Sequence, residues 1–293
     1  MIATGGPVRS TVVRAFDGLE LAVVIWPGSD GRPGVFFMHA TGFVKEIWAP
    51  VVTELRRRGV ETPCVAADQR GHGDSDTPEP PFAWEALGGD VAAVRAELDG
   101  RWVGVGHSSG GAAIAMAQVA SPGLFEALLL IEPIVFPPPH LRLEDHPFAT
   151  LALRRRYAFA DRDAALANFA GKGPFARWDP RSLEAYVDGA LREDEGRLLL
   201  KCEPAVEAEF YRTGNSHDTW DHLGSIAAPV TLMAGSESSS HPASFMRLLQ
   251  GRFQDATVTV VDGATHFVPM ERPDLVAGAI IDLGNRVQSP QRR

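Results

Sequence analysis

Cysteine is scarce in this chain of 293 residues, which contains only Cys64 and Cys202. Neither belongs to a Cys-x-x-Cys pair, and no cysteine–histidine cluster has the spacing of a zinc site. We therefore expect no disulfide framework, no bound metal and no other cofactor. Cys64 lies in an apolar segment and is expected to be a small core residue.

Long apolar runs and an excess of basic residues are also missing. No stretch approaches 18 apolar residues, and the first seven residues have neither a charged nor an apolar signal region. The 28 basic against 37 acidic residues give a net charge of −9, which argues against binding to nucleic acid or to an anionic membrane. We expect a cytoplasmic protein with a small-molecule substrate, and a homodimer is compatible with the sequence. The one basic run, residues 154–156, is expected to be a solvated helix face.

Short apolar segments alternate with amphipathic ones over residues 8–132 and again after residue 229. This alternation predicts an α/β fold, with a mostly parallel eight-stranded sheet flanked by helices. Residues 133–224 are charged and helix-like and carry no buried-strand signal. We therefore expect one core domain, residues 1–132 and 225–293, with a helical cap at 133–224, after the sixth strand. The expected strands are 8–14, 21–26, 34–38, 62–67, 101–106, 126–131, 230–234 and 257–261.

The strongest motif is Gly-x-Ser-x-Gly in VGVGHSSGG, residues 103–111. An apolar strand precedes it and an alanine-rich helix follows, which is the context that a nucleophilic serine at a strand-to-helix turn requires. Such a turn strains the serine backbone, and glycines on both sides avoid a collision. We predict that Ser108 is a nucleophile.

A serine hydroxyl needs a base, and in enzymes with this turn the chain order is Ser, Asp or Glu, then His. Of the nine histidines, only His266 lies in a loop between the last strand and the last helix. The acid is less obvious, because the segment 235–240 after the seventh strand contains no aspartate. Glu237 is one candidate; Glu132, which closes the apolar sixth strand, is favoured because its burial without a partner would be costly.

An oxyanion hole needs two backbone N–H donors. One is expected from Ser109, directly after the nucleophile. The other is expected from Thr41 in the loop His39-Ala40-Thr41-Gly42-Phe43, where glycine lets the backbone bend close to a substrate.

These residues together resemble the α/β-hydrolase superfamily over most of the chain except the insertion. FMHATG (37–42) looks like the family's His-Gly-x-Gly oxyanion loop, with Ala40 in place of glycine, and DQRGHGDS (68–75) looks like its Asp-x-Arg-Gly-x-Gly-x-Ser turn. In haloalkane dehalogenases and zearalenone-type lactonases the acid is a glutamate after strand six, and Glu132 occupies the corresponding position. Since Ser108 is not aspartate, the resemblance excludes dehalogenase and epoxide hydrolase chemistry.

The resemblance implies hydrolysis of a carboxylic ester or lactone through an acyl-enzyme. A carbon–carbon bond hydrolase, a cofactor-free perhydrolase and a non-catalytic ligand-binding member of the fold remain alternatives. The expected substrate-binding aromatics lie beside the oxyanion loop and in the cap; they are Phe43, Trp48, Trp178 and Trp220. Core packing is the competing explanation for the cap aromatics.

Overall fold

The structure is a computed structural model that describes residues 8–288. Its main sheet has eight strands in the order β1-β2-β4-β3-β5-β6-β10-β11. Only the pairings β1–β2 and β2–β4 are antiparallel; the others are parallel, so the predicted fold class is confirmed. The strands are β1 (Arg9–Arg14), β2 (Glu20–Trp26), β3 (Gly34–Met38), β4 (Cys64–Ala67), β5 (Trp102–His107), β6 (Ala127–Ile131), β10 (Val230–Gly235) and β11 (Ala256–Val261).

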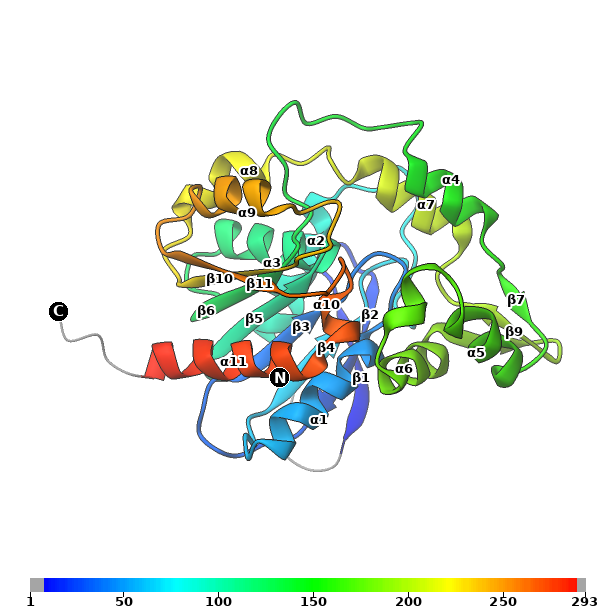
Figure 1. Cartoon of the computed structure of the whole chain (residues 1–293), viewed down its shortest axis with the longest axis horizontal. Helices are drawn as coiled ribbons and strands as arrows, with labels where there is room; N and C mark the ends of the chain where they lie inside the picture. The colour runs from blue at the N-terminus through cyan, green and yellow to red at the C-terminus, as the bar shows by residue number, and fades with distance from the viewer. Residues whose placement is uncertain (1–7, 289–293) are drawn as a thin grey trace.

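Helices cover both faces of this sheet (Figure 1). Side chains of a strand point to alternate faces, so a buried strand needs apolar residues at every position. In β6, Leu128 and Leu130 join one core with α2 and α3, while Leu129 and Ile131 join a second core with α1 and α11. The flanking helices are α1 (Ala49–Arg57), α2 (Glu85–Ala96), α3 (Ser109–Ala120), α9 (Ala243–Gln250), α10 (Val268–Glu271) and α11 (Pro273–Gln288), with a 3-10 turn η1 (Lys45–Trp48) before α1.

Most of the insertion between β6 and β10 lies beside the sheet, on the right of Figure 1, while its last α-helix packs on α9. It contributes apolar side chains to both cores: Phe210 of α7 packs with α2 and α3, whereas Trp178 and Tyr186 pack with α1 and α11. Its elements are α4 (Pro147–Arg154), β7 (Ala158–Phe159), α5 (Arg162–Ala170), η2 (Gly173–Arg177), α6 (Pro180–Ala190), β8 (Leu191–Asp194), β9 (Arg197–Leu200), α7 (Pro204–Thr213), α8 (Thr219–His222) and η3 (Leu223–Ser225).

A small antiparallel sheet, β7-β9-β8, makes the insertion less helical than expected. Strands β8 and β9 are joined through Glu195 and Gly196, both with positive φ, as a two-residue hairpin turn requires. Strand β8 is mostly exposed and polar, and β9 contributes only three consecutive leucines, a run shorter than those of most core strands.

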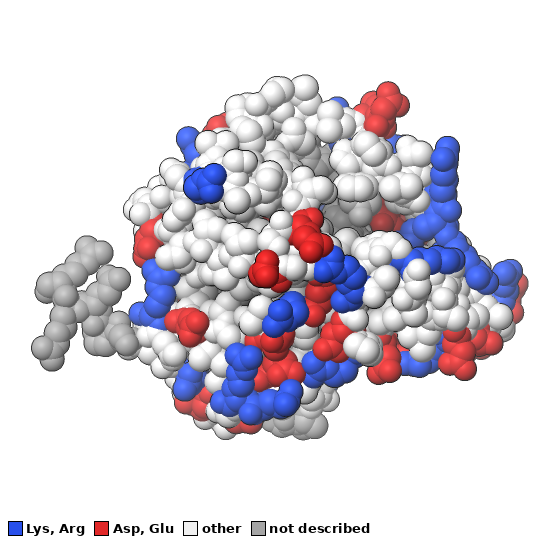
Figure 2. All heavy atoms as spheres, in the orientation of Figure 1, with Lys and Arg blue, Asp and Glu red and all other residues white. Residues whose placement is uncertain are grey.

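The surface carries acidic and basic side chains side by side rather than in one field of a single sign (Figure 2). Within residues 8–288, no helix is long and apolar enough to cross a membrane.

Candidate active site

Ser108 lies at the sharp turn between β5 and α3, with φ 56° and ψ −117°. This left-handed conformation is strained for a residue with a side chain, and hydrogen bonds to the chain around β6 hold it, besides the first bond of α3. The Ser108 N–H donates to the Ile131 carbonyl at 2.9 Å, and the Ile134 N–H donates to the Ser108 carbonyl at 3.1 Å. The turn is therefore tied to the residues on both sides of Glu132.

Two glycines make this turn sterically feasible. A Cβ on Gly106 would collide with the backbone oxygen of Gly110, and a Cβ on Gly110 would collide with the carbonyl oxygen of Met38. Backbone atoms cannot move aside as a flexible side chain can, so the collision must shift β3 or α3.

We expect Gly110→Ala to lower the free energy of unfolding by about 3 kcal/mol, as overpacking of a rigid site does. Urea denaturation followed by circular dichroism measures it. Gly89→Ala in α2 is the matched control, because a Cβ there meets no atom within 4 Å. Equal stabilities of the two variants would contradict this description of the turn.

Glu132 follows β6 directly and is fully buried. Its Oε1 accepts from the Gly235 N–H at 2.9 Å, and its Oε2 accepts from the Ser238 hydroxyl at 2.6 Å. The Nδ1 of His266 lies 2.5 Å from the same Oε2. Burial raises the pKa of Glu132, but the hydrogen bonds from His266 and Ser238 outweigh burial and hold that pKa well below its usual range. The carboxylate therefore stays ionised at neutral pH.

Glu237, the alternative acid, lies elsewhere. Its side chain is half exposed and pairs with Arg177 of the insertion at 2.5 Å. Arg177 also donates to the Gly263 carbonyl, in the loop that carries His266. Glu237 thus joins the insertion to the core, and of the two glutamates only Glu132 contacts the histidine.

His107, the residue before the nucleophile, connects the serine turn to the His266 loop. Its Nε2 lies 2.9 Å from the carbonyl oxygen of His266, and the two rings are 4.9 Å apart. Burial, with the neighbouring His266, lowers the pKa of His107 to about 3, so the ring is neutral and donates its Nε2–H. Ser108 and His266 are thereby held on adjacent loops.

The predicted oxyanion loop lies between β3 and η1. Gly42 has φ 82°, and a Cβ there would approach Glu207 Oε1 to 2.8 Å. Among the described residues, the N–H groups of Thr41 and Ser109 have no hydrogen-bond acceptor. Ser109 is the first residue of α3, where N–H groups lack intrahelical partners. Both N–H groups are available to an external oxygen atom.

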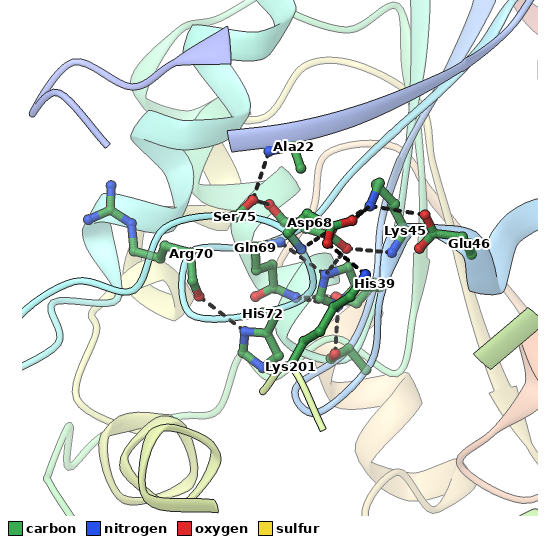
Figure 3. Close-up of polar contacts among 12 residues, drawn as sticks. Ala22, His39, Lys45, Glu46, Asp68, Gln69, Arg70, His72, Ser75 and Lys201 are labelled. Atoms are coloured by element: carbon green, nitrogen blue, oxygen red, sulfur yellow. Dashed lines mark hydrogen bonds and ion pairs between the residues drawn. The ribbon is translucent and has the colours of Figure 1, made fainter. Parts of the chain in front are cut away.

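Buried polar groups hold this loop against the serine turn (Figure 3). Gln69 donates its amide N–H to the carbonyl of His39 and to Ser109 Oγ, while its backbone N–H donates to His39 Nε2 at 2.9 Å. Asp68 accepts from the backbone N–H and from Nζ of Lys45, each at 2.7 Å. The DQRGHGDS turn thus positions the residues before and after Thr41.

The four predicted substrate-binding aromatics divide into two pairs. The ring centroids of Phe43 and Trp178 are 5.3 Å apart. Each of these two rings lies 6.0 Å, centroid to centroid, from the ring of Phe267, the neighbour of His266. Trp48 is fully buried and stacks on Phe37 within the core, and Trp220 stacks on Phe245. Trp48 and Trp220 thus pack against core aromatics, and their contact with a substrate stays a prediction.

Arg155 was not predicted as a site residue. The run 154–156 was expected to be a solvated face, but Arg155 turns inward, bonds Glu207 and donates to Tyr186 Oη at 2.7 Å. Glu207 is the residue that approaches Gly42. A basic run has no apolar periodicity from which this inward turn could be predicted.

Ser238, Ser240 and His241 are further residues that the sequence analysis missed. They surround Glu132, but the serine-rich loop and the following histidine carry no motif. The sequence has no aspartate directly after β10. This absence was the one available signal that a carboxylate from another strand must contact His266.

Comparison with known proteins places the chain in a family. The sequence profile described as "Alpha/beta hydrolase family" matches residues 35–279. The 2-(acetamidomethylene)succinate hydrolase of Mesorhizobium japonicum is 27% identical over 252 residues, which cover 85% of this chain and 86% of that protein. The type I acyl-CoA thioesterase mpaH of Penicillium roqueforti is 30% identical over 209 residues, covering 66% and 46%.

Solved structures show the same fold. The crystal structure of E-2-(acetamidomethylene)succinate hydrolase has a TM-score of 0.81 at 24% identity, covering 95% of this chain and 99% of that one. The enol-lactonase of Burkholderia xenovorans LB400 has a TM-score of 0.71 at 20% identity, covering 93% and 99%.

Proposed function

Because this chain belongs to the α/β-hydrolase family, we propose that it is a serine hydrolase that cleaves a carboxylic ester or lactone through an acyl-enzyme on Ser108. The observation that carries the proposal is the buried Glu132 carboxylate, 2.5 Å from Nδ1 of His266 and beside the strained serine turn. A buried, ionised carboxylate on a histidine of this loop has the position of a triad acid.

The tautomer of His266 follows from this contact. Because Glu132 is ionised, Nδ1 carries the proton and donates it, which leaves the lone pair on Nε2. Nε2 then takes the proton of Ser108 as its oxygen attacks the substrate carbonyl, and Glu132 stabilises the resulting imidazolium. His266 next returns the proton to the leaving alcohol.

The negative oxygen that forms on the carbonyl carbon is bound by the N–H groups of Thr41 and Ser109. Each such donor lowers the activation free energy by about 3 kcal/mol when it is already oriented toward the oxyanion before the reaction. Water then attacks the acyl-enzyme, with His266 as its base, and releases the acid. Every step uses only residues of this chain.

The aromatic residues beside the loop suggest the kind of substrate. Phe43, Trp178 and Phe267 contact one another between the oxyanion loop, the insertion and the His266 loop. This wall favours an apolar or aromatic acyl or alcohol group. We propose that residues 133–224 act as a cap, because the insertion brings Trp178 to the wall.

The names of these relatives describe enzymes that act on an acyl-CoA, a lactone and a substituted succinate. These names support a hydrolytic reaction for this chain, but they do not point to one common substrate. Hydrolysis of a carbon–carbon bond would use the same three side chains, so it is included in the test.

The proposal is tested by labelling with a fluorophosphonate probe, together with hydrolysis of p-nitrophenyl esters, aliphatic lactones and a vinylogous 1,5-diketone. We expect wild type and Ser121→Ala to be labelled and to cleave esters or lactones, and Ser108→Ala to do neither. Ser121 follows α3 at its far end and serves as the matched control. A wild type that is neither labelled nor active would refute the proposal, and cleavage of the diketone alone would reassign the reaction.

A further inference from the structure

Three side chains that could bind a metal ion lie close together on the Nδ1 side of His266, which is one of them. Among residues 8–288, Glu132 Oε2, His241 Nδ1 and His266 Nδ1 all lie within 4.8 Å of one another. The hydroxyl of Ser240 lies between them, 3.0 Å from His241 Nδ1, 3.2 Å from Glu132 Oε2 and 3.3 Å from His266 Nδ1. Two imidazoles and a carboxylate are a ligand set that Zn²⁺ prefers.

His241 has no role in the proposed reaction, yet its orientation is fixed. It is fully buried, and its Nε2 lies 3.0 Å from the Pro133 carbonyl oxygen, which can only accept. Nε2 therefore carries the proton, and the lone pair of Nδ1 points toward Glu132 Oε2, 3.4 Å away. Imidazoles that bind metals are held in this way, through a second-nitrogen N–H bonded to a backbone carbonyl.

The carboxylate is supported in the same manner. Glu132 accepts from the Gly235 N–H and from the Ser238 hydroxyl, so its orientation does not depend on either histidine. Ligating carboxylates are commonly hydrogen-bonded by such neighbours. Two of the three ligands are thus rigid and already aimed at a common point.

We propose that Glu132, His241 and His266 form an inhibitory site for a transition-metal ion such as Zn²⁺. Ligands of a tetrahedral zinc ion at bond lengths of about 2.0 Å are separated by roughly 3.3 Å. The Glu132–His266 contact of 2.5 Å must therefore open slightly. His266 is the member that can move, because its side chain is 24% exposed while the other two are fully buried.

The inhibition rests on the proposed function of His266. A metal ion on Nδ1 displaces the proton there, and the neutral ring keeps its single proton on Nε2 instead. Nε2 then has no lone pair for the proton of Ser108, and Glu132 no longer accepts from the ring. The bound ion therefore blocks the base without touching the nucleophile.

His241→Gln separates metal binding from catalysis. The Gln side-chain amide can replace Nε2–H as donor to the Pro133 carbonyl, but it supplies no nitrogen lone pair at the position of Nδ1. Isothermal titration with zinc chloride should give one site per wild-type chain and an affinity at least about tenfold weaker in His241→Gln. His222→Gln is the matched control, because His222 is exposed and pairs only with Asp218; its affinity should equal that of wild type.

Ester hydrolysis gives the second readout. Zinc should inhibit wild type and His222→Gln, EDTA should reverse the inhibition, and His241→Gln should need at least about tenfold more zinc for half inhibition. Equal zinc affinity and inhibition in wild type and His241→Gln would overturn the proposal. If zinc binds through His241 but the wild type cleaves no substrate, the metal site stands and the proposed function fails.

Co²⁺ binding provides a test that needs no change at the site. Co²⁺ added to wild type should produce the intense visible absorption of a tetrahedral nitrogen–oxygen site, and one equivalent of Zn²⁺ should remove it. Absence of this absorption at saturating Co²⁺ would contradict the assigned ligand set, even if His241→Gln did not fold.

Discussion

Replacement of Glu132 by Gln should lower kcat about 10⁴-fold with little change in the fold. The amide has nearly the shape of the carboxylate: its oxygen at the Oε1 position still accepts from the Gly235 N–H, and its NH2 group at the Oε2 position can donate to the Ser238 hydroxyl. Toward His266, however, it carries no negative charge and can present an N–H, which favours the tautomer with the proton on Nε2. The imidazolium that forms during acylation also loses its stabilising charge.

Glu237→Gln is the matched control for this loss. Glu237 is half exposed and contacts Arg177 rather than His266, so we expect a change in kcat of less than about twofold. Steady-state hydrolysis of the best p-nitrophenyl ester, with circular dichroism of both variants, measures the difference. Equal and mild effects of the two substitutions would exclude both glutamates as the triad acid.

The choice between these glutamates illustrates what the sequence can predict. The loop after β10 lacks an aspartate, which suggested that a carboxylate from another strand takes its position. The structure explains the arrangement physically: Gly235 ends β10 with its N–H on Glu132 Oε1, and a Cβ at Gly235 would collide with the backbone of Ala264. The chain beyond β10 thus surrounds Glu132 with donors instead of supplying an acid.

Strand and helix positions were predictable because the apolar residues of the central strands occupy every position and glycines mark the turns. The serine turn combined such a strand with glycines where a Cβ cannot fit. The sequence did not predict which part of the structure each side chain of the insertion contacts. Trp178 and Trp220 are both buried aromatics, and only the packing of the folded chain places one against Phe267 and the other against Phe245 of α9.

Mild acidification should destabilise this protein steeply. His39, His72 and His107 are fully buried, and burial is the main cause that lowers each pKa to about 3. In the unfolded chain their pKa returns to about 6.5. Between these values the unfolded state binds more protons, so the free energy of unfolding rises with pH and is fully present only above about pH 6.5.

Each such histidine contributes about 1.4 kcal/mol per pH unit, so three contribute about 4 kcal/mol per unit. Since domains are stable by only about 5–15 kcal/mol, we expect unfolding before about pH 4. Glu132 acts at lower pH, because its lowered pKa adds stability that is lost only as pH falls below about 4.5. Among the groups whose pKa is lowered in the folded protein, the histidines therefore dominate the window from about pH 6.5 to about pH 4.5.

Urea denaturation at several pH values between about 7.5 and about 5 measures this slope. His72→Leu should reduce it by about one quarter, because Leu does not titrate and because His217, whose pKa burial lowers to about 4, contributes beside the other three rings. His72 Nε2 has no partner, so little polar contact is lost beyond the bond to the Arg70 carbonyl. His222→Gln should leave the slope unchanged, since His222 is more than half exposed. A flat stability profile over this range would mean that the buried rings accept protons in the folded state, which their burial opposes.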